Sequence, residues 1–150
     1  MSSFNSYLYS LGIAERFLPD EYNLQNNQLT VPNTFVLSRM KSGEILSVYS
    51  DNIWDLSPYL PKCHCRLSFD SWLKNASEDD FLFCRIRAEM KKISFALLYI
   101  KSGKSIIKSI EKRHTVLRQF ARLAYKNGCT LQQLFSDAAY LSKVNDAYVG

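Results

Sequence analysis

Residues 105–126, SIIKSIEKRHTVLRQFARLAYK, decide the fold that the sequence predicts. When they are placed at intervals of about 100°, apolar side chains gather on one side with the i, i+3, i+4, i+7 spacing of a helix that packs on a core. The apolar side comprises Ile106, Ile107, Ile110, Leu117, Phe120, Ala121 and Ala124. The spacing therefore predicts one long amphipathic helix.

The opposite side of this helix is almost entirely basic. It carries Lys104, Lys108, Lys112, Arg118, Arg122 and Lys126, with Thr115 and Gln119 among them and Glu111 as its single acid. Solvated helix surfaces usually mix charges, because like charges at i, i+4 destabilise a helix by about 0.2–0.5 kcal/mol. The pattern favours contact with phosphate groups, and a basic surface that only maintains solubility is the alternative.

Positive charge is concentrated around this helix. The chain of 150 residues has a net charge of +5, yet residues 85–126 hold twelve Lys or Arg against two Glu. Such asymmetry is typical of nucleic-acid contact more than of general solubility. Apolar residues at 47% and aromatic residues at 13% indicate a folded chain with one sizeable core.

Two further helices are predicted on either side of this stretch. Residues 78–101 are apolar on two sides, which is typical of a helix central to a bundle. Ser77 is its predicted N-cap, with acids at positions 78–80 in the first turn, and Gly103 its C-terminal signal. Thr130–Gln133 matches a capping box and predicts a third helix that reaches about Asp146.

The N-terminal part predicts strands. Residues 34–40 and 44–50 are rich in β-branched and aromatic side chains, and Gly43 lies between them, so a β-hairpin is expected. Residues 51–61 are expected to form an ordered aromatic loop. Short helices are expected over residues 6–17, where Gly12 weakens the pattern, and over residues 68–73.

These elements predict a mainly α protein. Residues 1–62 form an N-terminal segment whose β-hairpin is an appendage, and residues 66–150 form a helical domain, a bundle of three to four helices. A single α+β domain, with the hairpin fully packed on the helices, is the alternative. Contacts from Trp54 and Tyr59 to the long helices would favour that alternative.

Catalytic and metal-binding patterns are sparse. Cys63-His64-Cys65 lacks the second ligand pair that structural zinc sites use, so partly buried thiols near a junction are the preferred interpretation, and metal binding there stays open. His114 is interpreted as a core or boundary residue. The sequence has no Gly-rich phosphate loop and no nucleophile elbow. No catalytic residue, cofactor, metal or small-molecule substrate is therefore predicted for this chain alone.

The N-terminus shows no signal peptide, because it has no basic region followed by an apolar run. No uninterrupted apolar run is long enough to span a bilayer. A cytoplasmic protein without membrane contact is expected.

From Asp51 onward, the order of elements resembles the N-terminal region of tyrosine-type site-specific recombinases, which are phage-integrase-like proteins. The resemblance covers about residues 45–145 and rests on IWDLSPY at 53–59, the long helix after it, RHTVLRQFARLAYKNG at 113–128, and TLQQLF at 130–135. It implies a helical, SAM-like core-binding domain that covers one face of the target DNA. The family's catalytic residues belong to a separate C-terminal domain, and nothing in this chain matches them.

One functional hypothesis and one alternative follow. The hypothesis is the DNA-binding region of a site-specific recombinase or integrase of a mobile element, which contacts duplex DNA and self-associates on it. Its predicted DNA contacts are Lys104, Lys108, Lys112, Arg118, Gln119, Arg122 and Lys126. The alternative is a protein-interaction or regulatory adaptor that docks a partner through aromatic residues around Trp54, Tyr59 and Trp72.

Overall fold

The structure is a computed structural model that describes residues 3–23, 29–60, 64–100 and 107–136. Its helices are α1 (Ser3–Ser10), the 3-10 turn η1 (Glu15–Phe17), α2 (Phe81–Tyr99) and α4 (Ile110–Lys126), and residues 131–136 are also helical. Its strands are β1 (Val36–Arg39), β2 (Ile45–Val48), β3 (Ile53–Asp55) and β4 (Arg66–Ser68). The described part of the chain is thus a small, mainly helical fold with short antiparallel hairpins.

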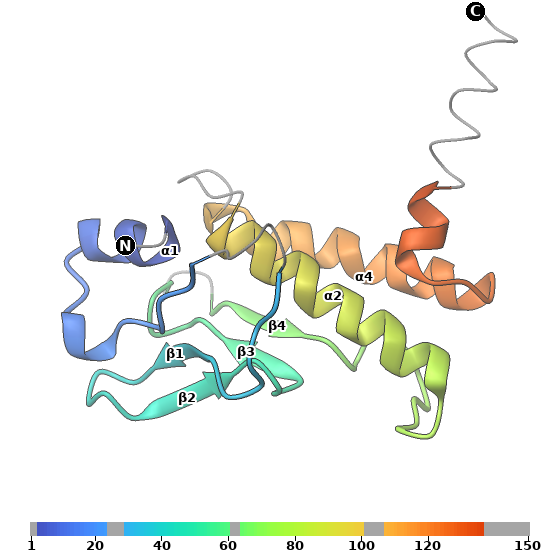
Figure 1. Cartoon of the computed structure of the whole chain (residues 1–150), viewed down its shortest axis with the longest axis horizontal. Coiled ribbons are helices and arrows are strands. Elements are labelled where there is room, and N and C mark those ends of the chain that lie inside the picture. Colours follow the sequence, from blue (N-terminus) through green and yellow to red (C-terminus); the bar gives the residue numbers. More distant parts are fainter. Residues whose placement is uncertain (1–2, 24–28, 61–63, 101–106, 137–150) are drawn as a thin grey trace, which may run out of the picture.

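The helices and hairpins form two layers. Helices α2 and α4 lie side by side, and both hairpins, β1–β2 and β3–β4, lie on one side of them (Figure 1). One buried cluster extends from Phe4 in α1 through both hairpins to Leu131 beyond α4. Residues from both predicted segments, 1–62 and 66–150, share this core. The hairpin is therefore packed into the core, as the alternative of a single α+β unit expects.

Phe95 of α2 is the centre of the contact between the helices and the strands. Its ring stacks on Tyr99 at a centroid distance of 4.5 Å, and edge-to-face contacts join it to Tyr22 at 4.9 Å and Phe35 at 5.2 Å. Tyr49, just after β2, adds a further edge-to-face contact at 5.8 Å. Such aromatic pairs contribute about 0.5–1.5 kcal/mol each beyond the burial of their area.

The predicted hairpin over residues 34–50 is confirmed as β1 and β2. Gly43 has a φ of +94° in its turn, a conformation that side chains with a Cβ rarely adopt. A Cβ at this position would also lie 3.3 Å from the carbonyl oxygen of Arg16. The turn therefore requires glycine for both its backbone angle and its close approach to η1.

The prediction of a loop over residues 51–61 is wrong in part, and the prediction of a helix over residues 68–73 is wrong. Ile53–Asp55 forms β3, whose Trp54 lies opposite Leu67 of β4, and residues 69–75 are turns. Each strand has three residues, which is too short for an alternating pattern to be read in the sequence. Burial of Trp54 and Leu67 in the common core holds this short pair together.

The start of α2 differs from the prediction. The helix begins at Phe81, and its N-cap is Asp80, whose Oδ1 accepts a hydrogen bond of 3.1 Å from the Phe83 amide. Ser77 is therefore not the cap, and the acids precede the first turn. Asp80 also accepts a hydrogen bond from the Tyr125 hydroxyl, and these two bonds, Tyr125 first, lower the pKa of Asp80. One carboxylate thus caps α2 and ties it to the end of α4.

The long basic helix is confirmed from Ile110 to Lys126. Residues 107–108 are helical but Ser109 is a turn, and residues 105–106 lie outside the described part. The apolar side is largely as predicted, with buried residues Ile107, Ile110, Leu117, Ala121 and Ala124. Phe120 was placed on that side wrongly, because its side chain is 39% exposed.

The capping box at the start of the third helix is confirmed. The Thr130 amide donates to Gln133 Oε1 at 2.9 Å, and the Gln133 amide donates to Thr130 Oγ1 at 3.2 Å. Helical residues 131–136 follow. The predicted extension to Asp146 lies outside the described residues, as does Gly103.

Near the N-terminus, the helix expected over residues 6–17 is instead α1 followed by η1, separated by Gly12 at a φ of +84°.

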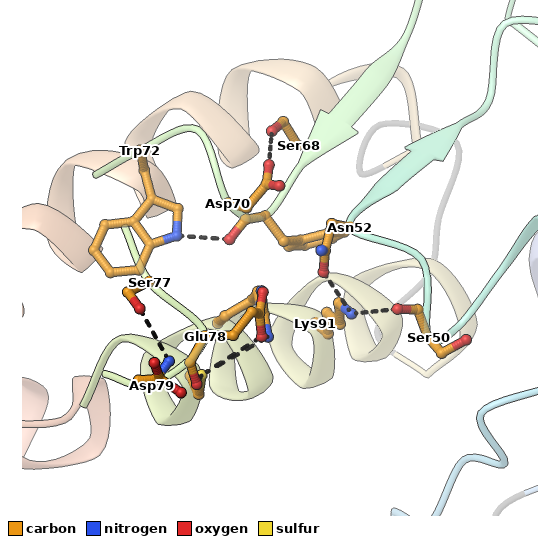
Figure 2. A network of polar contacts seen from close by, with 12 residues as sticks. Ser50, Asn52, Ser68, Asp70, Trp72, Ser77, Glu78, Asp79 and Lys91 are labelled. Carbon is orange, nitrogen blue, oxygen red and sulfur yellow. Dashed lines mark hydrogen bonds and ion pairs between the residues drawn. The ribbon is translucent and has the colours of Figure 1, made fainter. Parts of the chain in front are cut away.

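A buried lysine links α2 to the turn that joins the two hairpins. Lys91 is only 8% exposed, and its Nζ donates to the Ser50 carbonyl at 3.0 Å and to Asn52 Oδ1 at 3.4 Å (Figure 2). Burial lowers the pKa of Lys91, and the neighbouring charge of Arg87 acts in the same direction. Lys91 therefore serves the packing of the hairpins on α2, although it belongs to the basic region of the sequence.

Replacing Lys91 with methionine is expected to lower the free energy of unfolding by about 1–3 kcal/mol, because two acceptors lose their donor. Lys92 offers the matched control, since its side chain is exposed and Lys92→Met should change stability by less than about 0.5 kcal/mol. Urea unfolding followed by circular dichroism measures both. Equal effects at the two positions would contradict the buried link.

Candidate nucleic-acid interface

One side of α4 is basic and exposed along its whole length. The exposed residues are Lys108, just before the helix, and Lys112, Gln119, Arg122 and Lys126 within it, and we call this set the basic face. The buried residues of α4 lie on the opposite side. A helix of 17 residues is about 25 Å long, roughly twice the width of about 12 Å of the B-DNA major groove. Cations at its two ends can therefore reach phosphates on both sides of one groove.

The remaining predicted contacts behave differently. Arg118 is half-buried, and its Nη2 donates to Ser71 Oγ at 3.2 Å, so its guanidinium is turned toward the segment after β4. Its Nε is buried with no hydrogen-bond partner among the described residues. Lys104 lies outside the described part of the chain. The structure thus brings together five of the seven residues predicted to contact DNA.

Three further exposed cations adjoin this region, and residue-by-residue reading of the sequence did not single them out: Arg85 and Lys92 on α2, and Arg113 on α4. Among the described residues, neither they nor the cations of the basic face form ion pairs. In the sequence these cations count only toward the excess of positive charge over residues 85–126. The side of the fold on which they lie is defined only when the helices are packed.

Two nearby acids, Glu89 and Glu78, are engaged in holding the fold together, whereas Glu111 is exposed in the first turn of α4. Glu89 accepts hydrogen bonds of 2.9 and 3.0 Å from the amides of Leu131 and Gln132, at the start of the third helix. Glu78 forms a paired contact of 2.6 and 2.7 Å with the guanidinium of Arg87, which lowers the pKa of Glu78. These carboxylates therefore do not neutralise the exposed cations.

His114 is a core residue, as the sequence suggested. Its Nε2 lies 2.6 Å from the Ser68 carbonyl oxygen. Because a carbonyl only accepts hydrogen bonds, Nε2 carries the proton and Nδ1 is unprotonated, without a partner among the described residues. Burial lowers the pKa of His114, and the charge of Arg118 lowers it further, against the opposing effect of the carbonyl. The imidazole is thus a neutral link between α4 and β4.

Acidification is expected to destabilise the protein through His114. Its folded pKa lies below the unfolded value of about 6.5, so the unfolded chain takes up the proton first as pH falls. The contribution of neutral His114 is complete above about pH 6.5 and is lost as pH falls through the folded pKa. Urea unfolding at about pH 7.5 and about pH 5.5 should show a smaller loss in His114→Gln than in the parent.

The matched control for this measurement is His64→Gln, because His64 is exposed. This variant should keep the parent's loss of stability on acidification. A His114→Gln variant that loses as much stability as the parent between the two pH values would show that His114 does not cause the effect.

The Cys63-His64-Cys65 cluster is divided by the fold. Cys65 is buried in the core, His64 is exposed with a φ of 44°, and Cys63 lies outside the described residues. Within the described ranges, no group of three or more Cys, His, Asp or Glu side chains is placed to hold a metal ion.

The aromatic residues of the alternative hypothesis are interior. Trp54 is 0% exposed, and Tyr59 and Trp72 are each 2% exposed. The Tyr59 hydroxyl donates to the Phe17 carbonyl and accepts from the Arg39 amide at 2.9 Å, and burial raises the pKa of Tyr59 to about 12. The expectation that these side chains form a docking surface is wrong, because they hold the hairpins to the core.

Two further findings bear on function. None of the helices in the described ranges is both long and apolar enough to cross a membrane. No protein-family model, curated protein or solved structure matches the chain. The candidate interface therefore rests on geometry and charge, and the resemblance to recombinases stays a hypothesis.

Proposed function

We propose that this chain binds duplex DNA through the basic face, as the DNA-binding region of a tyrosine-type site-specific recombinase or integrase. One observation carries the proposal: Lys112, Arg122 and Lys126 are exposed on one side of α4, Lys108 is exposed just before it, and none of the four forms an ion pair with a described residue. Cations arranged in this way release counterions from DNA when they contact its phosphates, and this release drives association.

In this proposal α4 lies over a groove of the duplex. Lys108 and Lys126, near the two ends of the basic face, contact phosphates of opposite strands and fix the position of the helix. Gln119 lies between them and is exposed. A glutamine side chain can donate to a phosphate or pair with the edge of an adenine, so Gln119 is the residue of this face best suited to read a base.

The proposal includes a SAM-like core-binding arrangement, and the contact between α2 and α4 supports it. Helix α2 packs on α4, and Glu89 of α2 holds the start of helical residues 131–136. The chain would bind and orient DNA in the cytoplasm, with self-association of copies on the DNA. Breaking and rejoining of strands would require a catalytic domain beyond the residues that we describe.

Titration of a fluorescent duplex tests the proposal. The duplex should cover two helical turns, about 20 base pairs. Anisotropy measured between about 50 and 200 mM salt should show log K falling linearly with log salt, with a slope of about −3.6 for four phosphate contacts. Absence of binding at the lowest salt concentration would overturn the proposal.

A further inference from the structure

Helix α4 has a second apolar stripe that is not part of the core. Val116, Phe120 and Leu123 follow the i, i+4, i+7 spacing and are 48%, 39% and 46% exposed. They lie between the buried side of the helix and the basic face. An exposed stripe of this kind on a helix marks a surface that another chain can cover.

A groove follows part of this stripe. Between α2 and α4 lies a hollow of about 450 Å³, whose apolar lining comes from Ile93, Leu97, Val116, Leu117 and Phe120. A second hollow of about 600 Å³ shares Ile93 and extends to Leu131 and Phe135. Phe120 of the first hollow and Phe135 of the second are in edge-to-face contact, with ring centroids 5.3 Å apart. The second hollow lies between α2 and the helical residues 131–136, and we call the two hollows together the α2–α4 groove.

The edges of the α2–α4 groove are positively charged. Lys112 and Arg113 line the first hollow, and Arg85 and Lys92 line the second. Glu89 is the one acid among the lining residues, and both of its oxygens accept backbone hydrogen bonds at the start of the third helix. The groove thus combines an apolar floor with cations that no neighbouring carboxylate neutralises among the described residues.

We propose that the α2–α4 groove binds an acidic amphipathic helix of a partner protein. Two helices packed side by side present a groove into which the apolar side of a third helix fits, as in other complexes of a helix in a groove. Carboxylates flanking that apolar side would face Arg85, Lys92, Lys112 and Arg113, and this complementarity selects an acidic partner.

Other occupants fit this groove less well. A second copy of the chain would bring the same cations against one another across a twofold axis. Duplex DNA gains nothing from an apolar floor, and Arg122 and Lys126 of the basic face do not line the groove. The partner site is therefore distinct from the proposed DNA interface, and the two surfaces share Lys112.

A pair of synthetic helical peptides tests the proposal. The first is roughly 18 residues long, about 27 Å, with leucines at i, i+3, i+4 and i+7 and glutamates flanking them. The second carries lysine in place of each glutamate. Fluorescence anisotropy with the whole chain should show at least about tenfold tighter binding of the acidic peptide. Equal affinity, tighter binding of the basic peptide, or no binding would overturn the proposal.

Variants of the chain locate the peptide. The double variant Val116→Gln and Phe120→Gln should weaken binding of the acidic peptide at least about tenfold. Phe81→Gln is the control and should leave peptide affinity unchanged, because Phe81 is 77% exposed and lies outside the groove. If the double variant loses its helical circular dichroism signal, the variant Lys112→Gln and Arg113→Gln replaces it, because both positions are exposed. Removing these two charges should also weaken binding of the acidic peptide. Unchanged peptide affinity in folded variants would overturn the site.

The same variants separate this site from the proposed DNA interface. Arg122→Gln with Lys126→Gln should weaken duplex binding and leave peptide affinity unchanged. Loss of DNA affinity in Val116→Gln with Phe120→Gln would assign the groove to DNA. If the parent sediments as a dimer and this variant sediments as a monomer, the groove would be assigned to a second copy of the chain. Either result would overturn the peptide proposal, and failure of the parent to bind DNA would leave it standing.

Discussion

Replacing Phe95 with alanine is expected to lower the free energy of unfolding by about 3–5 kcal/mol, a large part of the stability of a small domain. Phe95 is fully buried and contacts Tyr22 and Phe35 from the N-terminal part as well as Tyr99 of its own helix. Its removal leaves a cavity at the junction of helices and strands. Phe81→Ala is the matched control on the same helix, and because Phe81 is 77% exposed its cost should stay below about 0.5 kcal/mol.

This variant also tests whether the chain folds as one unit. Trp72 packs on Phe83 of α2, so the measurement uses a Trp72→Phe background for both the parent and the variant. In that background Trp54 of β3 reports on the hairpins by fluorescence, and circular dichroism reports on the helices. If one core joins both layers, Phe95→Ala should shift the two unfolding transitions together. A fluorescence transition that stays in place while the helical transition moves would show that residues 1–62 fold as a separate unit.

Local patterns predicted the elements whose formation depends on nearby residues. Helix α2 and most of α4 follow from a period of about 3.6 residues, and the third helix from its capping box at Thr130. The second hairpin could not be read in this way. Its strands are three residues long, and pairing of Trp54 with Leu67 is stabilised by a core assembled from distant segments.

The start of α2 illustrates the same limit. Ser77 and Asp80 both have side chains that can cap a helix. The structure uses Asp80, whose carboxylate also accepts from Tyr125, a residue 45 positions away. No local pattern distinguishes the two candidates, because Tyr125 contacts Asp80 only when α4 packs on α2.

The candidate interface could likewise be predicted only in part. The basic face was predictable because its residues share one side of one helix. Arg118 was assigned to it by helical spacing, but its contact is with Ser71, 47 residues earlier in the chain. The α2–α4 groove was not predictable, because its two walls come from different helices and Phe120 reads as a core residue when α4 is considered alone.

Removing three charges from the basic face is expected to have the largest effect on DNA binding. In the variant Lys108→Gln, Arg122→Gln and Lys126→Gln, all three side chains are exposed and lie outside the α2–α4 groove. Each lost phosphate contact reduces the slope of log K against log salt by about 0.9, so the slope should become shallower by about 2.7. Affinity at about 0.1 M salt should fall on the order of a hundredfold, to a similar degree on every duplex sequence.

The fold should survive this substitution. Glutamine forms helices nearly as well as lysine and arginine, and removing like charges relieves repulsion along α4, so stability should stay within about 0.5 kcal/mol of the parent. Lys126 is the partial exception, because a cation in the last turn of a helix is stabilised by the helix dipole. Thermal unfolding by circular dichroism measures the difference.

A matched triple variant separates a specific face from net charge. Arg16→Gln, Lys41→Gln and Lys74→Gln remove the same charge from exposed positions in η1, the first hairpin turn and the segment before α2. If the basic face contacts phosphates, this variant should retain the salt slope of the parent and most of its affinity. Equal losses in the two triple variants would mean that DNA responds only to total charge. An unchanged slope after substitution of the basic face itself would mean that this side of α4 is a solvated surface.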